Sequence, residues 1–241
     1  LCDIYTPDGK PNERSSRYIL ERTAAMAEQK GYTCYIDPEC EFFLFHTDDN
    51  GVPTTLTHEK AGYLDISPVD LGENARRDMV LNLEDMGMEI ESSHHETAPA
   101  QHEIDFRCDE IRKMADHIMT FKMAVRTIAK RHGLHATFMP KPKVDANGSG
   151  MHIRFSLFKE GRNIFVDPKN PQELSEDAYY FVGGLLAHSR EMAVITNPVV
   201  NSYKRLVPGY EAPTELTWTT NNQNSLIRIP GARGEHTGIE L

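Results

Sequence analysis

Three glutamates and three histidines lie within one stretch near the middle of the chain, residues 91–103. The residues before it (88–91) and after it (103–106) alternate between polar and apolar, which is typical of two strands joined by a turn. Glu96 and Glu103 would then face each other across the mouth of a hairpin. Carboxylates that close repel each other unless a proton or a cation lies between them. The alternative is a solvated hairpin whose acids lie on the surface, as most glutamates do.

A second pair of acids opens an aromatic segment, residues 39–45 (ECEFFLF). If this segment is a strand, Glu39 and Glu41 share one face with Phe43 and Phe45. Local sequence leaves two interpretations open, a strand end that emerges into solvent or a charged site. A glycine-rich loop at residues 147–152 allows a backbone to approach a ligand closely, although a generic turn is the commoner explanation.

Hydrophobic periodicity predicts the elements that would position these residues. Helices are expected over residues 15–30, 67–86, 109–132 and 175–195, the second of them with Ser67 as N-cap and Pro68 at its first position. Strands are expected over 34–45, 134–139, 151–158, 225–230 and 239–241, beside the hairpin. Residues 197–213 show little periodicity and are expected to form a loop. Helices that alternate with hairpin-like strand pairs predict an α+β fold with an antiparallel sheet.

Composition narrows the function classes. The net charge of −10 over 241 residues argues against nucleic acid as a partner. The four cysteines show no disulfide-framework or metal spacing, and no apolar run is long enough to span a bilayer. We therefore expect a soluble, cytoplasmic protein without membrane partners. Because the chain begins without methionine and stops inside an alternating run, we also expect a piece of a longer protein.

Five segments in order, residues 38–43, 94–96, 141–143, 147–152 and 201–213, resemble the catalytic domain of a bacterial or archaeal type I glutamine synthetase. The resemblance covers nearly the whole chain. It implies a curved antiparallel or mixed sheet packed with helices, of the glutamine synthetase/guanido kinase type. It also implies that residues 1–241 form an incomplete catalytic domain, with a β-grasp domain before it and further helical chain after it.

The resemblance implies two divalent cation sites. One corresponds to Glu41, Glu96 and Glu103. The other corresponds to Glu39, His152 and Glu240. Five carboxylates and one imidazole form an oxygen-rich ligand set suited to Mg²⁺ or Mn²⁺ rather than zinc. His94 and His95 match the family's His-His-Glu motif and are expected to have supporting or structural roles.

The resemblance further implies ATP-dependent ligation of ammonia to glutamate through γ-glutamyl phosphate. Arg205 corresponds to the arginine that holds the substrate carboxylate, and its planar guanidinium suits bidentate binding. Asn147 and Gly148 correspond to the loop that holds the glutamate backbone. Glu211 corresponds to a flap residue that helps to remove a proton from ammonium. The nucleotide-binding positions of the family correspond to Glu91, Arg154, Ser156, Gln223 and Arg228.

Ordinary structural or surface roles remain as alternatives for several of these residues. Arg205, Glu211, Arg228 and Glu91 could be ordinary solvent-facing residues, and His152 could be a structural histidine. The sequence also departs from the family, which usually has arginine at position 223 (here Gln223), histidine at 154 (here Arg154) and arginine at 238 (here Gly238). Two of these changes remove cations from a polyphosphate site, and Arg154 restores one.

Three functions therefore stand at this point: glutamine synthetase, a related γ-glutamyl-amine ligase that uses a larger amine, and a non-catalytic structural homologue. Decay of the metal ligands would favour the third, and none is seen. The resemblance also implies stacked hexameric rings of the full-length protein, with each active site shared between subunits.

Overall fold

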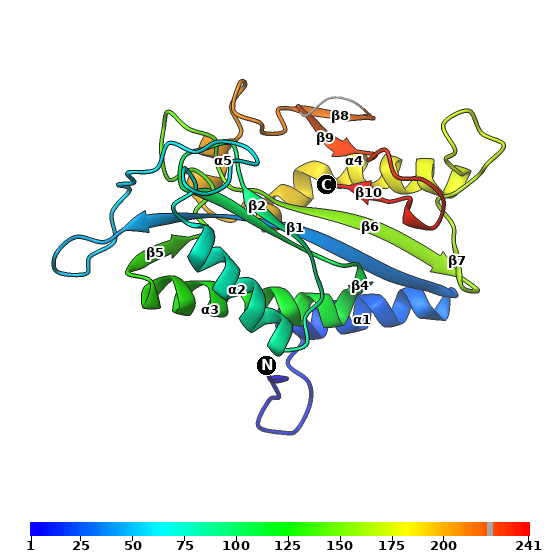
Figure 1. The fold of residues 1–241 in the computed structure, drawn as a ribbon. Coiled ribbons are helices and arrows are strands. Elements are labelled where there is room, and N and C mark those ends of the chain that lie inside the picture. Colours follow the sequence, from blue (N-terminus) through cyan, green and yellow to red (C-terminus); the bar gives the residue numbers. More distant parts are fainter. Residues whose placement is uncertain (221–223) are drawn as a thin grey trace.

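The computed structural model describes residues 1–220 and 224–241, which form one open, curved, mixed sheet with helices packed against it (Figure 1). Neighbouring strands follow the order β2 (Ile90–His95), β3 (Gln101–Phe106), β1 (Tyr32–His46), β6 (Met151–Lys159), β10 (Ile239–Glu240), β9 (Ser225–Arg228) and β8 (Glu215–Thr219). Three short strands lie off this path: β4 (Asp109–Glu110) and β5 (Leu134–Thr137) pair with β1, and β7 (Arg162–Asn163) pairs with β6. Strands β8 and β9 are parallel, whereas the other pairs are antiparallel.

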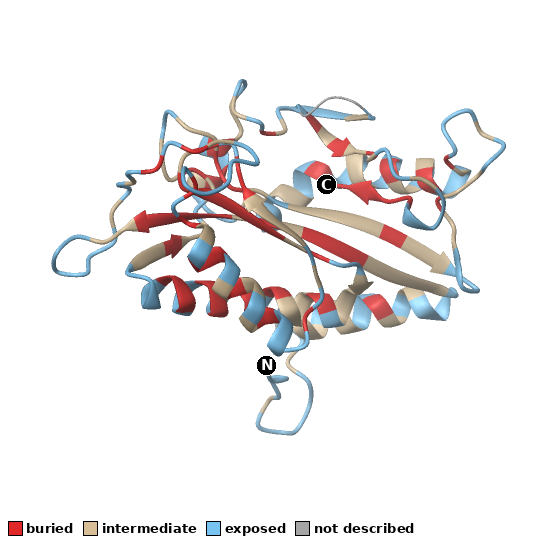
Figure 2. Ribbon diagram, in the orientation of Figure 1, coloured by how far each residue is buried: buried red, intermediate tan, exposed pale blue. Residues whose placement is uncertain are grey.

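Strand β1 organises the sheet because its two faces differ in polarity. Its apolar side chains Cys40, Phe42 and Leu44 are buried against α2 (Glu73–Asp85) and α3 (Ile111–Arg131). α1 (Ser16–Gln29) extends this layer along the lower face in Figure 1. Figure 2 shows the buried residues concentrated in β1, in its partner strands and on the inward side of α3. The acids of β1 therefore project from the opposite face, since successive side chains of a strand alternate.

A second core lies at the other end of the sheet. Helix α4 (Glu176–Thr196) covers β9 and β10 there through Val182, Ile227 and Ile239. Phe155 of β6 packs beside the first core and also contacts Phe181 of α4, so both helical groups lie against the apolar side. No helix of residues 1–220 and 224–241 is long and apolar enough to cross a membrane.

The predicted α+β class is confirmed, and most predicted elements are present. The predicted helix start at Ser67 and Pro68 is wrong, because α2 begins at Glu73 with Gly72 as its N-cap. The Glu59 carboxylate accepts the backbone N–H groups of Leu71 and Gly72, which holds this part of the chain in a turn instead of a helix. The stretch 197–213 is not entirely loop, since it contains the short helix α5 (Val200–Arg205).

Candidate functional site

The acidic residues meet on the polar face of the sheet because of strand register. Glu41 lies directly opposite Glu103 of β3, and Glu39 lies opposite both Asp105 of β3 and His152 of β6. Side chains of directly opposed residues project to the same side of an antiparallel sheet. Glu240 of β10 lies on the next strand beyond β6 and is 3.6 Å from His152, measured from Oε1 to Nδ1. Residues from four strands and the hairpin turn thus converge on one surface.

The two predicted ligand sets lie next to each other on the polar face. His152 Nε2 lies 3.6 Å from Glu41 Oε1, and its Nδ1 lies equally close to Glu240, so His152 is near members of both sets. Among the side chains that the structure describes, His94, Glu96 and Glu103 have ligand atoms within 4.8 Å of one another, and Glu41 is outside that group. His94 Nδ1 is 3.6 Å from Glu96 and its Nε2 is 3.5 Å from Glu103.

Burial gives these acids unusual proton affinities. Burial, with repulsion from Glu240 and Asp105, raises the pKa of Glu39 to about 8. Burial also raises the pKa of Glu41 to about 7, although Arg205 opposes the shift. The pKa of Glu103 is raised by burial and by the neighbouring Asp105. Such shifts mean that the site lacks the positive charge needed to hold all its carboxylates ionised.

His152 has the opposite behaviour. Burial and the cations Arg228 and Arg205 lower the pKa of its imidazole to about 3. The ring is therefore neutral near pH 7 and keeps a nitrogen lone pair available for a metal ion.

One end of the site is formed by the loop 146–150 and the segment after α5. The Asn147 side-chain amide donates to Glu211 Oε2 at 2.5 Å, and Arg205 Nη2 donates to the Glu211 carbonyl at 3.4 Å. Asn201 exchanges hydrogen bonds with both backbone groups of Lys141, at 2.7 and 3.0 Å, which fixes α5 against this loop. The structure thus brings together the predicted glutamate-binding residues.

Arg205 is a buried cation that makes no ion-pair contact with a carboxylate of residues 1–220 and 224–241, although its charge favours the ionised form of Glu41. Its side chain is 8% exposed, and its Nε atom has no hydrogen-bond partner in the described part of the chain. No carboxylate of that part lies within ion-pair distance of its guanidinium. A buried charge is stable only when it is paired, so this position suits an anionic ligand.

Glycines make room for this arrangement. A Cβ at Gly148 would lie 2.0 Å from the carbonyl oxygen of Pro140, so only glycine fits there. A Cβ at Gly150 would lie 2.8 Å from both Arg205 Nη2 and His152 Nε2. The backbone N–H of Gly150 also donates to Glu41 at 3.1 Å. Gly150 therefore allows the metal-ligand candidates and the candidate substrate arginine to lie next to one another.

The other end of the site contains the predicted nucleotide-binding residues. Arg154 forms an ion pair with Asp37, which lies directly opposite it on β1, while Glu91 is exposed on β2 and contributes negative charge nearby. A Cβ at Gly238 would lie 2.3 Å from Arg154 Cγ, so Arg154 fills the space beside that glycine. Ser156 donates to the Thr237 carbonyl at 3.2 Å.

The two remaining nucleotide predictions have different outcomes. Arg228 of β9 forms an ion pair with Glu240, its directly opposed residue on β10, and so lies at the edge of the acidic cluster. Gln223 lies outside the described residues.

Comparison with known proteins decides the family. The family model for the glutamine synthetase catalytic domain matches residues 13–241. This chain belongs to that family. It is 58% identical to a glutamine synthetase of Clostridium saccharobutylicum and 53% identical to one of Methanosarcina mazei, and each match covers 100% of this chain and 54% of the relative. The chain thus spans about half the length of these relatives.

Solved structures of the family show the same fold. A cryoEM structure of Plasmodium falciparum glutamine synthetase matches with a TM-score of 0.89 at 28% identity, covering 99% of this chain and 53% of that one. A GmaS/ADP complex matches with a TM-score of 0.86 at 29% identity, covering 99% and 56%. The predicted glutamine synthetase type of fold is therefore confirmed.

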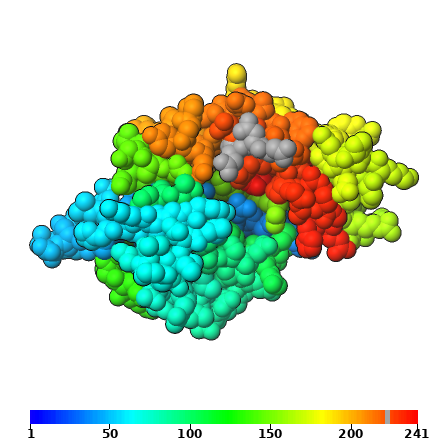
Figure 3. All heavy atoms as spheres, turned by 45° about the horizontal axis from the view of Figure 1, so that its top comes forward, coloured from blue at the N-terminus to red at the C-terminus, as the bar shows by residue number. Residues whose placement is uncertain are grey.

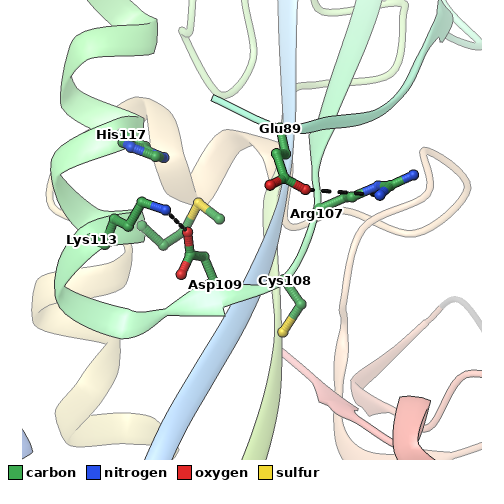
Figure 4. A pocket seen from close by; sticks show the side chains of 7 residues that line it. Glu89, Arg107, Cys108, Asp109, Lys113 and His117 are labelled. Carbon is green, nitrogen blue, oxygen red and sulfur yellow. Dashed lines mark ion pairs between the residues drawn. The ribbon is translucent and has the colours of Figure 1, made fainter. Parts of the chain in front are cut away.

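The polar face of this glutamine synthetase domain is hollowed. Figure 3 shows blue atoms at the bottom of a depression between the cyan and green segments and the orange and red ones. A separate cavity of about 220 Å³ lies at the open end of the β2–β3 hairpin, beside Glu89 and Arg107 and away from the turn (Figure 4). Its acids and bases pair with each other, Glu89 with Arg107 and Asp109 with Lys113, and none of the predicted site residues lines it. This cavity therefore does not compete with the polar face as the functional site.

Sequence reasoning missed two features of this glutamine synthetase domain. It gave His94 a supporting or structural role, although His94 lies directly opposite Glu103 in the hairpin, and that register could have indicated their closeness. It also missed a buried polar cluster on the other face of the hairpin, formed by Glu59, Asp70, Arg76, His95 and His102. Of these five residues, only His95 and His102 could have been placed on that face from the sequence. They stand next to Glu96 and Glu103, and neighbouring side chains of a strand point to opposite faces.

Proposed function

We propose that the full-length protein is a cytoplasmic glutamate–ammonia ligase, which joins ammonia to L-glutamate and produces L-glutamine, ADP and phosphate. The observation that carries this proposal is the acidic cluster next to Arg205, a buried cation that makes no ion-pair contact with the described residues. A polyanion and a substrate carboxylate must be brought together, and these two features offer complementary binding for each. Family membership supports the same reaction.

The residues present fit two divalent cations. The donor set comprises the carboxylates of Glu39, Glu41, Glu96, Glu103 and Glu240 together with a neutral His152. The carboxylate pKa values are raised, and the buried Asp105 Oδ1 has no hydrogen-bond partner among the described residues, which indicates missing positive charge at this place. Mg²⁺ and Mn²⁺ both prefer such oxygen-rich sites. When bound, these ions supply charge that offsets the nucleotide phosphates and the transferring phosphoryl group.

His94 is an additional ligand candidate in this proposal, beside the Glu41, Glu96 and Glu103 set. Its ring nitrogens lie 3.6 Å from Glu96 and 3.5 Å from Glu103, and these three side chains form a group of possible ligand atoms that does not include Glu41. Its imidazole could also act through hydrogen bonds to these carboxylates and hold them in place.

The chain's own residues then position the reactants. Arg205 binds a carboxylate of glutamate, and Asn147 with the Gly148 backbone holds the amino-acid moiety. The γ-carboxylate oxygen attacks the γ-phosphorus of ATP, giving γ-glutamyl phosphate and ADP, and ammonia then displaces phosphate. Much of the rate enhancement comes from holding two like-charged groups in contact. Glu211 accepts a hydrogen bond from the Asn147 side chain, and in this proposal it accepts the proton that ammonium must lose.

The nucleotide lies at the opposite end in this proposal, beside Arg154, Ser156, Glu91 and Arg228. Arg154 and Arg228 each pair with an acid, Asp37 and Glu240, and so have fixed positions before ligand binding. Gln223 belongs to the same set by resemblance to the family.

We further infer that residues 1–241 are an incomplete catalytic domain. The remaining half of the protein would include a β-grasp domain, which in a stacked hexameric ring completes the site of a neighbouring subunit. The isolated chain should accordingly bind Mn²⁺ with nucleotide and yet ligate poorly.

Phosphate release by the full-length protein tests the proposed function. Reactions should contain ATP, Mg²⁺ or Mn²⁺ and glutamate, with ammonium, methylamine or a diamine as the acceptor. We expect glutamate-dependent release that is fastest with ammonium. Turnover with a larger amine and none with ammonium would instead identify a γ-glutamyl-amine ligase, and no turnover with any acceptor would identify a non-catalytic homologue.

A further inference from the structure

A buried polar cluster lies behind the acidic site, on the helix-facing side of the β2–β3 hairpin. His95 and His102 oppose each other across the hairpin and point away from Glu103, because side chains alternate along each strand. Glu59 and Asp70 come from the connection between β1 and α2, and Arg76 comes from α2. Each of these five residues is more than nine-tenths buried.

The cluster is not itself a cation site, although four of its members have ligand atoms within 4.8 Å of one another. Arg76 Nη1 already occupies the centre, 2.8 Å from Asp70 Oδ2 and 2.8 Å from His102 Nδ1. Both oxygens of Glu59 accept hydrogen bonds from protein groups. Arg76, His95 and backbone N–H groups therefore already satisfy the two acids without a metal ion.

Glu59 joins two segments through its carboxylate. Oε1 accepts from the His95 ring at 2.6 Å and from the backbone N–H of Ala100, and Oε2 accepts from the backbone N–H of Leu71 at 2.9 Å. Ala100 has a left-handed φ of 68°, so its N–H is aimed by an unusual backbone conformation. One buried carboxylate thus holds the end of the hairpin turn against the β1–α2 connection.

His95 holds the beginning of the same turn. Its Nε2 contacts the Glu59 carboxylate at 2.6 Å and its Nδ1 contacts the Glu96 carbonyl at 2.6 Å. Each ring nitrogen thus faces an oxygen atom that can accept a hydrogen bond, and the two contacts fix the orientation of the ring. The turn is therefore fixed at Glu96 by His95 and at Ala100 by Glu59.

The turn carries a proposed metal ligand, and its own hydrogen bonds transmit this anchoring. The Glu96 N–H donates to the Gln101 carbonyl at 2.8 Å, and the Glu96 carboxylate accepts the Thr97 N–H at 2.8 Å. The Gln101 side chain accepts the Ala98 N–H at 3.1 Å and donates to Glu41 at 2.8 Å. A shift of the turn would therefore move Glu96 relative to Glu41.

We propose that Glu59 and His95 are positioning residues, which fix the turn 96–100 and thereby set the place of the Glu96 carboxylate for cation binding. This inference rests on the metal site of the proposed function. Loss of the Glu59 charge leaves the N–H groups of Leu71, Ala100 and His95 competing for one amide oxygen. Residues that orient metal ligands typically contribute ~10–100-fold to metal affinity.

The test is a titration of the full-length protein with Mn²⁺. Electron paramagnetic resonance of free Mn²⁺ measures how much of the ion is bound. We expect Glu59→Gln to weaken Mn²⁺ binding at least ~10-fold, and Glu59→Asp, which keeps the charge, to weaken it less. Glu84→Gln makes the same chemical change on the exposed side of α2 and should bind like the wild type. Thermal unfolding, measured alongside, shows that each variant is folded at the titration temperature.

A double-mutant cycle separates positioning from a general loss of stability. If Glu59 acts through Glu96, adding Glu59→Gln to Glu96→Gln should change Mn²⁺ affinity less than ~3-fold, because the two effects are not independent. Full additivity, or wild-type affinity in folded Glu59→Gln and Glu59→Asp, would overturn the inference while leaving the proposed function intact. Absence of Mn²⁺ binding by the wild type would contradict the proposed function and this inference with it.

Discussion

Substitution of Gly150 by alanine is the smallest change that should disturb the whole site. The added Cβ would lie 2.8 Å from Arg205 Nη2, 2.8 Å from His152 Nε2 and 3.1 Å from Glu41 Oε1. Ordinary Cβ contacts begin near 3.4 Å, so the first two groups must each retreat by about 0.6 Å. Gly150 does not have a left-handed φ, so alanine introduces a steric conflict and no backbone strain.

The magnitude follows from the size of this displacement. A misplacement of about 1 Å at a reacting centre can reduce the rate ~100-fold, so we expect kcat/KM for glutamate to fall ~10–100-fold. Overpacking a well-filled site typically costs ~1–3 kcal/mol, and the low end applies here because the displaced atoms end flexible side chains. Steady-state phosphate release and thermal unfolding of the full-length protein measure the two effects.

Gly231→Ala is the matched control. Nothing lies within 4 Å of a Cβ at Gly231, and its φ is not left-handed, so the same methyl group should leave activity unchanged and stability within about 0.5 kcal/mol. Wild-type kcat/KM and wild-type Mn²⁺ affinity in Gly150→Ala would refute the reasoning, because the three groups could not then lie where the structure places them.

Three further predictions follow from the same site. Because Glu39 and Glu41 have pKa values raised to about 8 and about 7, the metal-free protein should lose stability as the pH rises from 5 to 9, by about 1.4 kcal/mol per unit of realised shift, and Mn²⁺ should restore it. Gly238→Ala should displace Arg154 and weaken ATP binding ~10-fold or more in equilibrium titration, since a 1.4 kcal/mol loss is tenfold. Arg205→Lys should raise the glutamate KM ~10–100-fold, because lysine cannot bind a carboxylate in the bidentate way.

Each of these predictions has a contradicting result. A melting temperature that rises steadily over the same pH range without metal would show that cations of the protein already hold these carboxylates ionised. Unchanged ATP affinity in Gly238→Ala would show that Arg154 lies away from the nucleotide. An unchanged glutamate KM in Arg205→Lys, with kcat intact, would assign the buried guanidinium a structural role.

The sequence predicted the fold well where one periodicity dominated. The hairpin around the Glu96 turn and helix α3 were expected within a few residues, because residues 88–91 and 103–106 alternate in polarity and the 3.6-residue repeat of α3 is uninterrupted. The start of α2 was predicted wrongly at Ser67. Local capping residues favoured a helix, but the Glu59 carboxylate, distant in sequence from Leu71, takes the N–H groups of the turn. Such tertiary competition leaves no periodic signal.

The site was predictable in its residue types but not in its grouping. Family resemblance indicated the acids, His152 and Arg205, and strand register places Glu39, Glu41, Glu103 and His152 on one face. Which ligand atoms come closest depends on side-chain conformations, so the register indicates the closeness of His94 to Glu103, whereas its closeness to Glu96 could not be obtained from spacing. The filling of the Gly238 space by Arg154 is likewise a packing relation, between strand β6 and the residue before β10. Sequence spacing alone does not encode it.

Transfer of oxygen from glutamate to phosphate tests the central claim most directly. The full-length protein should be incubated with ATP, Mg²⁺, ammonium and glutamate labelled with ¹⁸O in its γ-carboxylate, and the released phosphate analysed by mass spectrometry. Attack of that carboxylate on ATP, followed by ammonia, leaves one labelled oxygen in each phosphate. We predict this label in the phosphate; phosphate released without ¹⁸O would contradict the proposed phosphoryl transfer to glutamate.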